Sequence, residues 1–167
     1  MIEKNAVYSG SFDPVTNGHL DMIRRAKKIF GNVTVLVLEN VHKKTLFSLE
    51  ERISLLKEAL SGEEGIEVTS FSGLLADYFK KEKAYVIVRG IRGTGDLEHE
   101  LINAHYNGIF APEVETVFLP AKEKYRFVSS SAVREIWHHG GNFSDWVPSC
   151  VYKALQNKKS ENLSDGI

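Results

Sequence analysis

Short runs of β-branched and aromatic residues alternate along this chain with longer segments in which apolar residues recur every three or four positions. The runs predict strands at about residues 6–8, 33–38, 66–71, 85–88 and 116–119. The periodic segments predict amphipathic helices, the first with Leu20, Ile23 and Ala26 on one face. This alternation predicts an α/β fold in a single domain: a Rossmann-like, doubly wound parallel sheet of five strands with helices on both faces.

Breaks in the helical pattern predict where the later helices end. Gly108 predicts the end of a helix over residues 96–107, because glycine readily adopts the conformation that closes many helices. The last helix is predicted over residues 148–157. We therefore expect a folded domain over residues 1–157 and a polar, frayed tail over residues 158–167.

The composition is that of an ordinary one-domain protein. The chain has 167 residues, of which 43% are hydrophobic, enough for a sizeable core. Its 21 basic residues nearly balance 22 acidic ones, so we expect no nucleic acid and no membrane as partner. Cys150 is alone, which excludes an internal disulfide and suits a reducing compartment. The sequence shows neither a membrane-length apolar run nor a signal-peptide pattern, so a cytoplasmic location is expected.

The most informative segment joins the first strand to the first helix. Residues 9–19 read SGSFDPVTNGH, a glycine-containing turn that leads into the helix. Free backbone N–H groups and the positive end of the helix dipole favour an anion there, which predicts a nucleotide phosphate site. His19 lies in the first helical turn, where its imidazole can donate a hydrogen bond to a phosphoryl oxygen. The dipole would discourage the charged ring while no anion is bound.

Ligands of doubly wound sheets lie outside the carboxyl ends of the strands, near the point where the strand order reverses. Polar residues follow each predicted strand, and the cations among them are Lys43, Lys44, Arg89, Arg92, Lys122, Lys124 and Arg126. Their convergence on one rim would favour a polyphosphate ligand. Ser129–Ser131 open a further helix on that rim and predict a second phosphate site.

Four sequence blocks resemble one known group of enzymes. Residues 10–19 (GSFDPVTNGH) are similar to its motif GTFDPxTxGH, residues 88–92 (VRGIR) to xRGLR, and residues 127–131 (FVSSS) to FISSS. Lys43 and Lys44 with residues 47–52 form the fourth block. On these residues the chain resembles the HxGH nucleotidyltransferase superfamily, most closely the bacterial phosphopantetheine adenylyltransferases, over nearly its whole length.

The resemblance implies transfer of the adenylyl group of ATP to 4′-phosphopantetheine, giving dephospho-coenzyme A and pyrophosphate with Mg²⁺ present. This is the penultimate step of coenzyme A biosynthesis. Because the acceptor phosphate is already an anion, direct in-line attack needs neither a general base nor a covalent enzyme intermediate. The sequence shows no carboxylate cage, so no protein ligand is expected for Mg²⁺. The resemblance also implies a homohexamer, built as a dimer of trimers, and coenzyme A as a candidate feedback ligand.

The resemblance carries roles onto matching positions of this chain. It implies catalytic roles for His19, Lys43 and Arg92. It implies ATP contacts at Ser11, Phe12, His19, Gly90, Ile91, Arg92, Glu100, Tyr125, Arg126, Phe127, Val128, Ser129, Ser130 and Ser131. It implies acceptor contacts at Ser11, Lys43, Leu75 and Arg89.

Other interpretations stay open. A relative with the same fold could use nicotinamide mononucleotide or a phosphorylated alcohol as acceptor, although Thr16 stands where those enzymes usually have histidine. A nucleotide-binding regulatory module without turnover is the alternative from another class. Arg89 and Arg92 could be structural ion-pair partners of nearby glutamates, and Leu75 could belong to the core.

Overall fold

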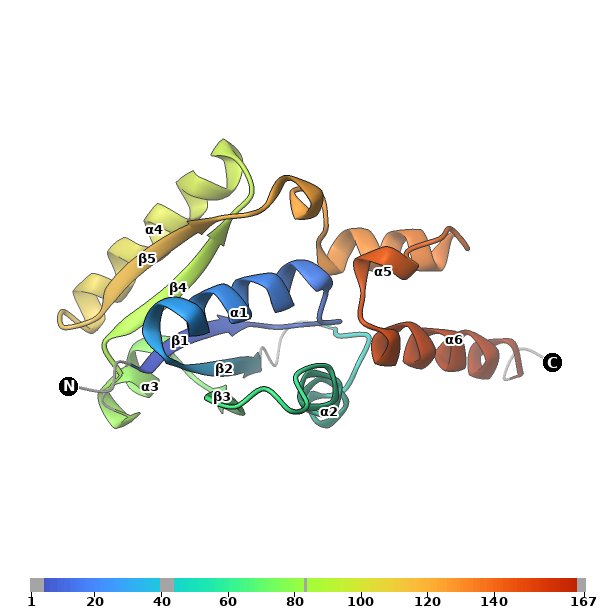
Figure 1. Cartoon of the computed structure of the whole chain (residues 1–167), viewed down its shortest axis with the longest axis horizontal. Helices are drawn as coiled ribbons and strands as arrows, with labels where there is room; N and C mark the ends of the chain where they lie inside the picture. The colour runs from blue at the N-terminus through green and yellow to red at the C-terminus, as the bar shows by residue number, and fades with distance from the viewer. Residues whose placement is uncertain (1–4, 40–43, 83, 165–167) are drawn as a thin grey trace.

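The sheet has five parallel strands at the centre of the molecule (Figure 1). The computed structural model describes residues 5–39, 44–82 and 84–164. Its strands are β1 (Asn5–Gly10), β2 (Asn32–Glu39), β3 (Ile66–Ser72), β4 (Val86–Ile91) and β5 (Glu115–Pro120). They lie side by side in the order β3-β2-β1-β4-β5, all parallel. Each predicted strand is present, with its ends shifted by three residues at most.

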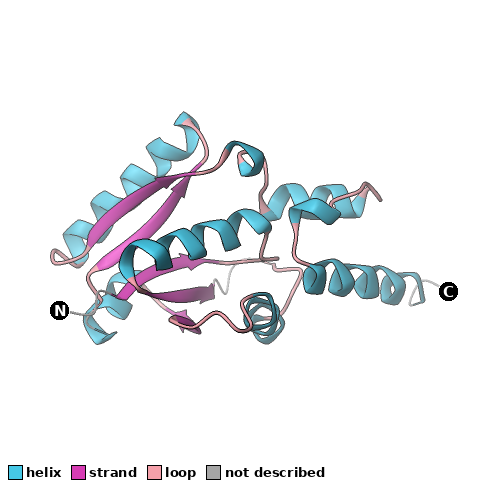
Figure 2. Ribbon diagram, in the orientation of Figure 1, coloured by secondary structure: helices cyan, strands magenta, loops and turns pink. Residues whose placement is uncertain are grey.

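Helices cover both faces of the sheet (Figure 2). Those in the described residues are α1 (Asn17–Phe30), α2 (Leu49–Ala59), α3 (Leu75–Glu82), α4 (Thr94–Phe110), α5 (Ser130–His138) and α6 (Ser149–Ser164). Two short 3₁₀ segments are η1 (Glu123–Tyr125) and η2 (Ser144–Trp146). None of these helices is both long and apolar enough to span a membrane. The predicted doubly wound α/β fold is confirmed.

Alternation of side chains along the strands divides the core into two layers. On one face of the sheet, Tyr8 of β1 belongs to a cluster with Ile23 of α1 and Leu56 of α2. On the other face, Val7 of β1 belongs to a cluster with Phe79 of α3. Successive residues of β1 therefore bury on opposite faces, as a parallel sheet covered on both sides requires.

α4 runs through Gly108 to Phe110, so the predicted helix end at that glycine is wrong. Gly108 does not have the positive φ that closes a helix, and a side chain at its position would meet open space. A glycine ends a helix only where the chain takes up the left-handed conformation, and here the chain does so nowhere in α4.

α6 continues to Ser164, beyond the predicted end at residue 157. Lys158 attaches this extension to the body of the protein. Its Nζ lies 2.9 Å from a carboxylate oxygen of Glu51 and 4.9 Å from the ring centre of Phe47. The ion pair and the cation–π contact hold a helical turn whose sequence is polar enough to predict fraying.

The strand order reverses between β1 and β4, because β2 and β3 continue on one side of β1 and β4 and β5 on the other. The carboxyl ends of β1 and β4 lead toward the N-termini of α1 and α4. α5 lies beyond the same ends of the strands (Figure 1). Three helix N-termini therefore surround the position where ligands of such sheets bind.

Candidate active site

A cavity of about 350 Å³ lies at this switch point. Its walls come from the turn after β1, the end of β4, and the first turns of α1, α4 and α5. Among the described residues that line it, Arg89, Arg92 and Arg134 are cationic, and Asp96 and Glu100 are anionic. Its volume is typical of small-molecule sites, and the excess of cations favours an anionic ligand.

His19 is held in one orientation by the start of α1. Thr16 caps the helix: its hydroxyl accepts a hydrogen bond from the His19 N–H at 3.3 Å, and its own N–H donates to His19 Nδ1 at 3.0 Å. Because Nδ1 accepts, the neutral ring carries its proton on Nε2. No other described residue hydrogen-bonds to this ring, which leaves the Nε2–H for a ligand.

Burial lowers the pKa of His19 to about 4, and the positive charge of Arg92 acts in the same direction. The ring is therefore neutral at neutral pH. The sequence predicted that the helix dipole would discourage the charged form, whereas burial is the larger cause. A neutral Nε2–H donor can bind a phosphate oxygen without any change of protonation.

Arg89 ties the end of β4 to α4 and β1. Its Nε and Nη2 donate to the two carboxylate oxygens of Glu100 at 2.6 and 2.7 Å, and Nη1 donates to the Ser9 carbonyl at 3.0 Å. Burial opposes the charge of Arg89, but the hydrogen bonds and charge of Glu100 outweigh it and raise the pKa of Arg89. Arg89 is therefore both the ion-pair partner of Glu100 and part of the cavity wall. The pairing fixes the plane of its guanidinium.

Arg92 makes a similar but more open pair with Asp96. Its Nε and Nη2 donate to the carboxylate oxygens at 2.7 and 3.1 Å, and the Arg92 N–H donates at 3.2 Å. The hydrogen bond from the Arg92 side chain lowers the pKa of Asp96. The Arg92 side chain is 40% exposed, so a bound phosphate can compete for it at little cost.

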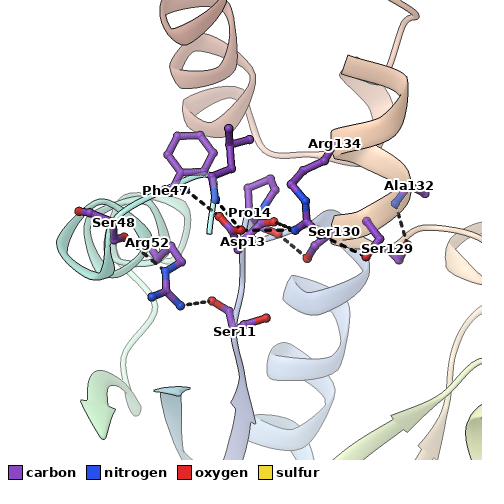
Figure 3. A network of polar contacts seen from close by, with 12 residues as sticks. Ser11, Asp13, Pro14, Phe47, Ser48, Arg52, Ser129, Ser130, Ala132 and Arg134 are labelled. Atoms are coloured by element: carbon purple, nitrogen blue, oxygen red, sulfur yellow. Dashed lines mark hydrogen bonds and ion pairs between the residues drawn. The ribbon is translucent and has the colours of Figure 1, made fainter. Parts of the chain in front are cut away.

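The turn after β1 is braced from two sides (Figure 3). The buried Asp13 carboxylate accepts hydrogen bonds from the N–H groups of residues 46–47, both at 2.9 Å. Arg134 donates to the Asp13 carbonyl and lies 3.4 Å from its carboxylate, while the Ser130 hydroxyl donates to the Pro14 carbonyl at 2.8 Å. These bonds satisfy a carboxylate that is only 1% exposed and fix the turn between α2 and α5.

The N-terminus of α5 forms the opposite wall. Ser129 caps the helix, because its hydroxyl accepts a hydrogen bond from the Ala132 N–H at 3.1 Å. Ser130 and Ser131 line the cavity beside it. This capped N-terminus, together with Arg134, can bind an anion.

The structure brings most of the predicted site residues together. The cavity is lined by Ser11, Phe12, His19, Arg89, Gly90, Arg92, Glu100, Tyr125, Val128, Ser129, Ser130 and Ser131. Four predicted residues are not part of that lining: Leu75, Ile91, Arg126 and Phe127. Lys43 lies outside the residues that the structure describes.

Several predicted rim cations bind partners at the surface instead. Lys122 Nζ lies 2.6 Å from the Asp21 carboxylate, and Arg126 lies 3.7 Å from that of Glu123. The cations absent from the cavity lining are Lys44, Lys122, Lys124 and Arg126. Arg89 and Arg92 line the cavity, whereas convergence of the other cations on the rim stays a prediction; Lys122 and Arg126 are paired with nearby carboxylates.

Leu75 packs, partly buried, with the core cluster on the α3 face. The strand before it, β3, is at the edge of the sheet, two places from β1. This position agrees with the core interpretation of Leu75, and its contact with an acceptor stays a prediction.

The cavity residues that received no role from the sequence include Tyr8, Asp96 and Arg134. Arg134 lies four residues after Ser130, a spacing that places both on one helix face and could have indicated it. Tyr8 looks like any apolar strand residue in the sequence. Burial raises its pKa to about 12, so its phenol stays protonated in the cavity wall.

Comparison with known proteins identifies the protein family to which this chain belongs. Residues 7–136 match the model of the cytidylyltransferase-like family, so the fold and the site define a nucleotidyltransferase. The chain is 46% identical to the phosphopantetheine adenylyltransferase of Haemophilus ducreyi, over 92% of this chain and 96% of that protein. It is 48% identical to that of Psychromonas ingrahamii (95% and 99%) and 49% to that of Dictyoglomus turgidum (92% and 96%). The chain belongs to the phosphopantetheine adenylyltransferase family.

Solved structures share the fold at lower identity. A bifunctional NMN adenylyltransferase/ADP ribose pyrophosphatase from Francisella tularensis matches with a TM-score of 0.69 and 17% identity, over 93% of this chain and 49% of that one. A second structure of such an enzyme, complexed with AMP and a Mn ion, also has a TM-score of 0.69, at 15% identity over 95% and 50%. This chain spans about half of those proteins, and the likeness shows the fold alone.

Proposed function

We propose that this chain transfers the adenylyl group of ATP to 4′-phosphopantetheine, giving dephospho-coenzyme A and pyrophosphate. This is the penultimate step of coenzyme A biosynthesis. Identity of 46 to 49% with phosphopantetheine adenylyltransferases, over nearly their full lengths, supports this acceptor. The structural observation that carries the proposal is His19, a neutral histidine with a free Nε2–H in a cavity lined by arginines.

In this proposal the ATP phosphates lie between His19 and the start of α5. Arg92 and Gly90 border the nucleotide, and Arg89 with Ser11 contacts the acceptor. The other ATP contacts follow the sequence expectation, including the segment 125–131. Lys43 and Leu75 keep the acceptor roles that the family resemblance implies.

The reaction is proposed to proceed by direct in-line attack of the acceptor phosphate on the α-phosphorus. The protein then has to overcome the repulsion of two anions and the loss of their freedom, which aligned cationic and N–H donors can do. In this proposal the His19 Nε2–H donates to an oxygen that gains charge in the transition state. Arg92 adds positive charge at the same cavity wall.

Mg²⁺ is proposed to enter with the triphosphate. The cavity carboxylates of Asp96 and Glu100 are each held by an arginine, and no group of three or more His, Cys, Asp or Glu side chains gathers elsewhere in the described residues. This donor set fits a metal held by phosphate oxygens and water rather than by a protein cage. Such an ion neutralises phosphate charge when bound.

Exposed apolar side chains on α4 support self-association of the chain, and we propose the homohexamer, a dimer of trimers, that the family resemblance implies. α4 buries none of its residues, and Leu101, Tyr106, Ile109 and Phe110 are each 51 to 55% exposed. Several large, half-exposed apolar side chains on one helix are unusual on a monomer. Sedimentation velocity should give the mass of the hexamer, and Ile109→Glu should dissociate the hexamer. A monomeric wild type would contradict this assembly.

We also propose a cytoplasmic location and coenzyme A as a feedback ligand.

The experiment that tests the function is pyrophosphate release from purified protein with ATP and Mg²⁺. Three acceptors are compared: 4′-phosphopantetheine, nicotinamide mononucleotide and glycerol 3-phosphate. Turnover confined to 4′-phosphopantetheine supports the proposal. Turnover with another acceptor assigns a sister activity, and ATP binding without turnover favours a regulatory module.

A further inference from the structure

Arg52 of α2 is a buried cation outside the cavity. It is 3% exposed, and its guanidinium donates only to backbone carbonyls: to Ser11 at 2.8 Å, to Ser48 at 3.3 Å and to Leu38 at 3.4 Å. Within the described part of the chain no carboxylate makes a hydrogen bond or a short ion pair with it. Burying a guanidinium costs desolvation free energy, which well-placed hydrogen bonds must offset. The acceptor of its shortest hydrogen bond therefore indicates which part of the structure Arg52 holds.

That acceptor belongs to the peptide between Ser11 and Phe12. In a planar trans peptide the C=O of one residue and the N–H of the next point in opposite directions. Figure 3 shows Arg52 on one side of the turn and Ser129 and Ser130, which line the cavity, on the other. Holding the Ser11 carbonyl toward Arg52 therefore turns the Phe12 N–H away from α2, toward the cavity side.

The Phe12 N–H is available to a ligand. No backbone or side-chain group in the described residues accepts a hydrogen bond from it. Phe12 has a φ of 47°, in the left-handed region that residues with a side chain rarely adopt. Such a conformation persists only where surrounding contacts hold it, and the bond from Arg52 is one of them.

We infer that Arg52 is a positioning residue of the ATP site, which orients the Ser11–Phe12 peptide so that the Phe12 N–H and the Ser11 hydroxyl serve the nucleotide. This inference rests on the proposed function, because it assumes that ATP binds at the turn. Arg52 itself does not touch the ligand. It links the N-terminus of α2 and the end of β2 to the geometry of the turn after β1.

The test is the affinity for ATP, measured by calorimetry with Mg²⁺ and without acceptor. Arg52→Met removes all three hydrogen bonds and should weaken ATP binding about 10- to 100-fold. Arg52→Lys can still donate to one carbonyl and should lie between this variant and the wild type. If Arg52→Met does not fold, Arg52→Lys alone decides.

Two controls separate positioning from stability. Leu55→Ala, in the core on the same helix, should lower the melting temperature while ATP affinity stays within about twofold. Arg24→Met makes the same exchange at an exposed pair with Glu63 and should change neither. Wild-type ATP affinity in both Arg52 variants, with only a lower melting temperature, would overturn the inference. Absence of ATP binding by the wild type would instead overturn the proposed function, and this inference with it.

Discussion

The two walls of the cavity are held in different ways. In the turn after β1, Phe12 and Asp13 are 2% and 1% exposed, and hydrogen bonds reach the turn from α2 and α5. The other wall includes Tyr125 and Val128 of the segment after β5. In that segment Phe127, which does not line the cavity, is 75% exposed, and Lys122, itself 54% exposed, makes an ion pair at the surface. The first wall is held by buried contacts, whereas the segment that carries part of the second wall has many exposed side chains.

This difference indicates that the two walls have different roles in binding a ligand. Buried, fully satisfied hydrogen bonds keep donors in place before a ligand arrives, which is what positioning of phosphates requires. Segments with few buried contacts open at low free energy, as parts that close over a ligand must. We expect the turn after β1 to be preformed, and the segment 125–131 to close over the triphosphate of ATP.

Phe12→Ala should lower the free energy of unfolding by removing the packing of the first wall. Its ring lies 5.2 Å from the His19 ring and 5.8 Å from that of Tyr8, between centroids, and a Cβ at Gly10 would lie within 3.1 to 3.4 Å of it. Removing such a buried ring costs about 3–5 kcal/mol of unfolding free energy. Urea unfolding would measure this loss. A change below about 1 kcal/mol would show that the turn is not held by packing.

His19→Ala should leave the first wall folded and remove its donor. Loss of one preorganised donor commonly lowers kcat on the order of 10²–10³. Pyrophosphate release measures kcat, and ATP affinity should stay within a few-fold. His139→Ala, at the exposed C-terminus of α5, is the matched control and should keep wild-type turnover. Unchanged turnover in His19→Ala would remove His19 from the reaction.

The same histidine makes stability depend on pH. Its pKa is about 4 in the folded protein against an ordinary value of 6.5, so between these values the unfolded chain binds a proton that the folded chain does not. The contribution is fully present above pH 6.5 and is lost as the pH falls toward 4, by up to about 3 kcal/mol. Urea unfolding at pH 7 and pH 4.5 should show a larger loss for the wild type than for His19→Gln. Equal losses would mean that His19 is open to protonation.

The fold was predictable because alternation and helical periodicity report which faces are buried, and both faces of this sheet are covered. The turn after β1 was predictable because its glycine and His19, placed between a strand pattern and a helix pattern, are local signals. The hydrogen bonds that hold that turn were not predictable, since they join positions far apart in the sequence. Asp13 accepts a hydrogen bond from residue 47, 34 positions away, and another from Arg134, 121 positions away. Charge alone could not place Lys122 either, because its partner Asp21 is 101 positions distant.

Phe127→Ala gives the sharpest contrast with Phe12→Ala, because the same exchange is made in the segment beside the other wall, at a residue that does not line the cavity. The exposed ring buries little surface, so unfolding free energy should change by less than about 0.5 kcal/mol. If the segment 125–131 closes over the nucleotide, the ring becomes buried in the complex and its removal should weaken ATP binding by about 3- to 10-fold. Calorimetry with Mg²⁺ and ATP checks this, with Ile29→Ala at an exposed position of α1 as control. Unchanged ATP affinity in Phe127→Ala would mean that the second wall stays open in the complex, and the first wall alone would then hold the nucleotide.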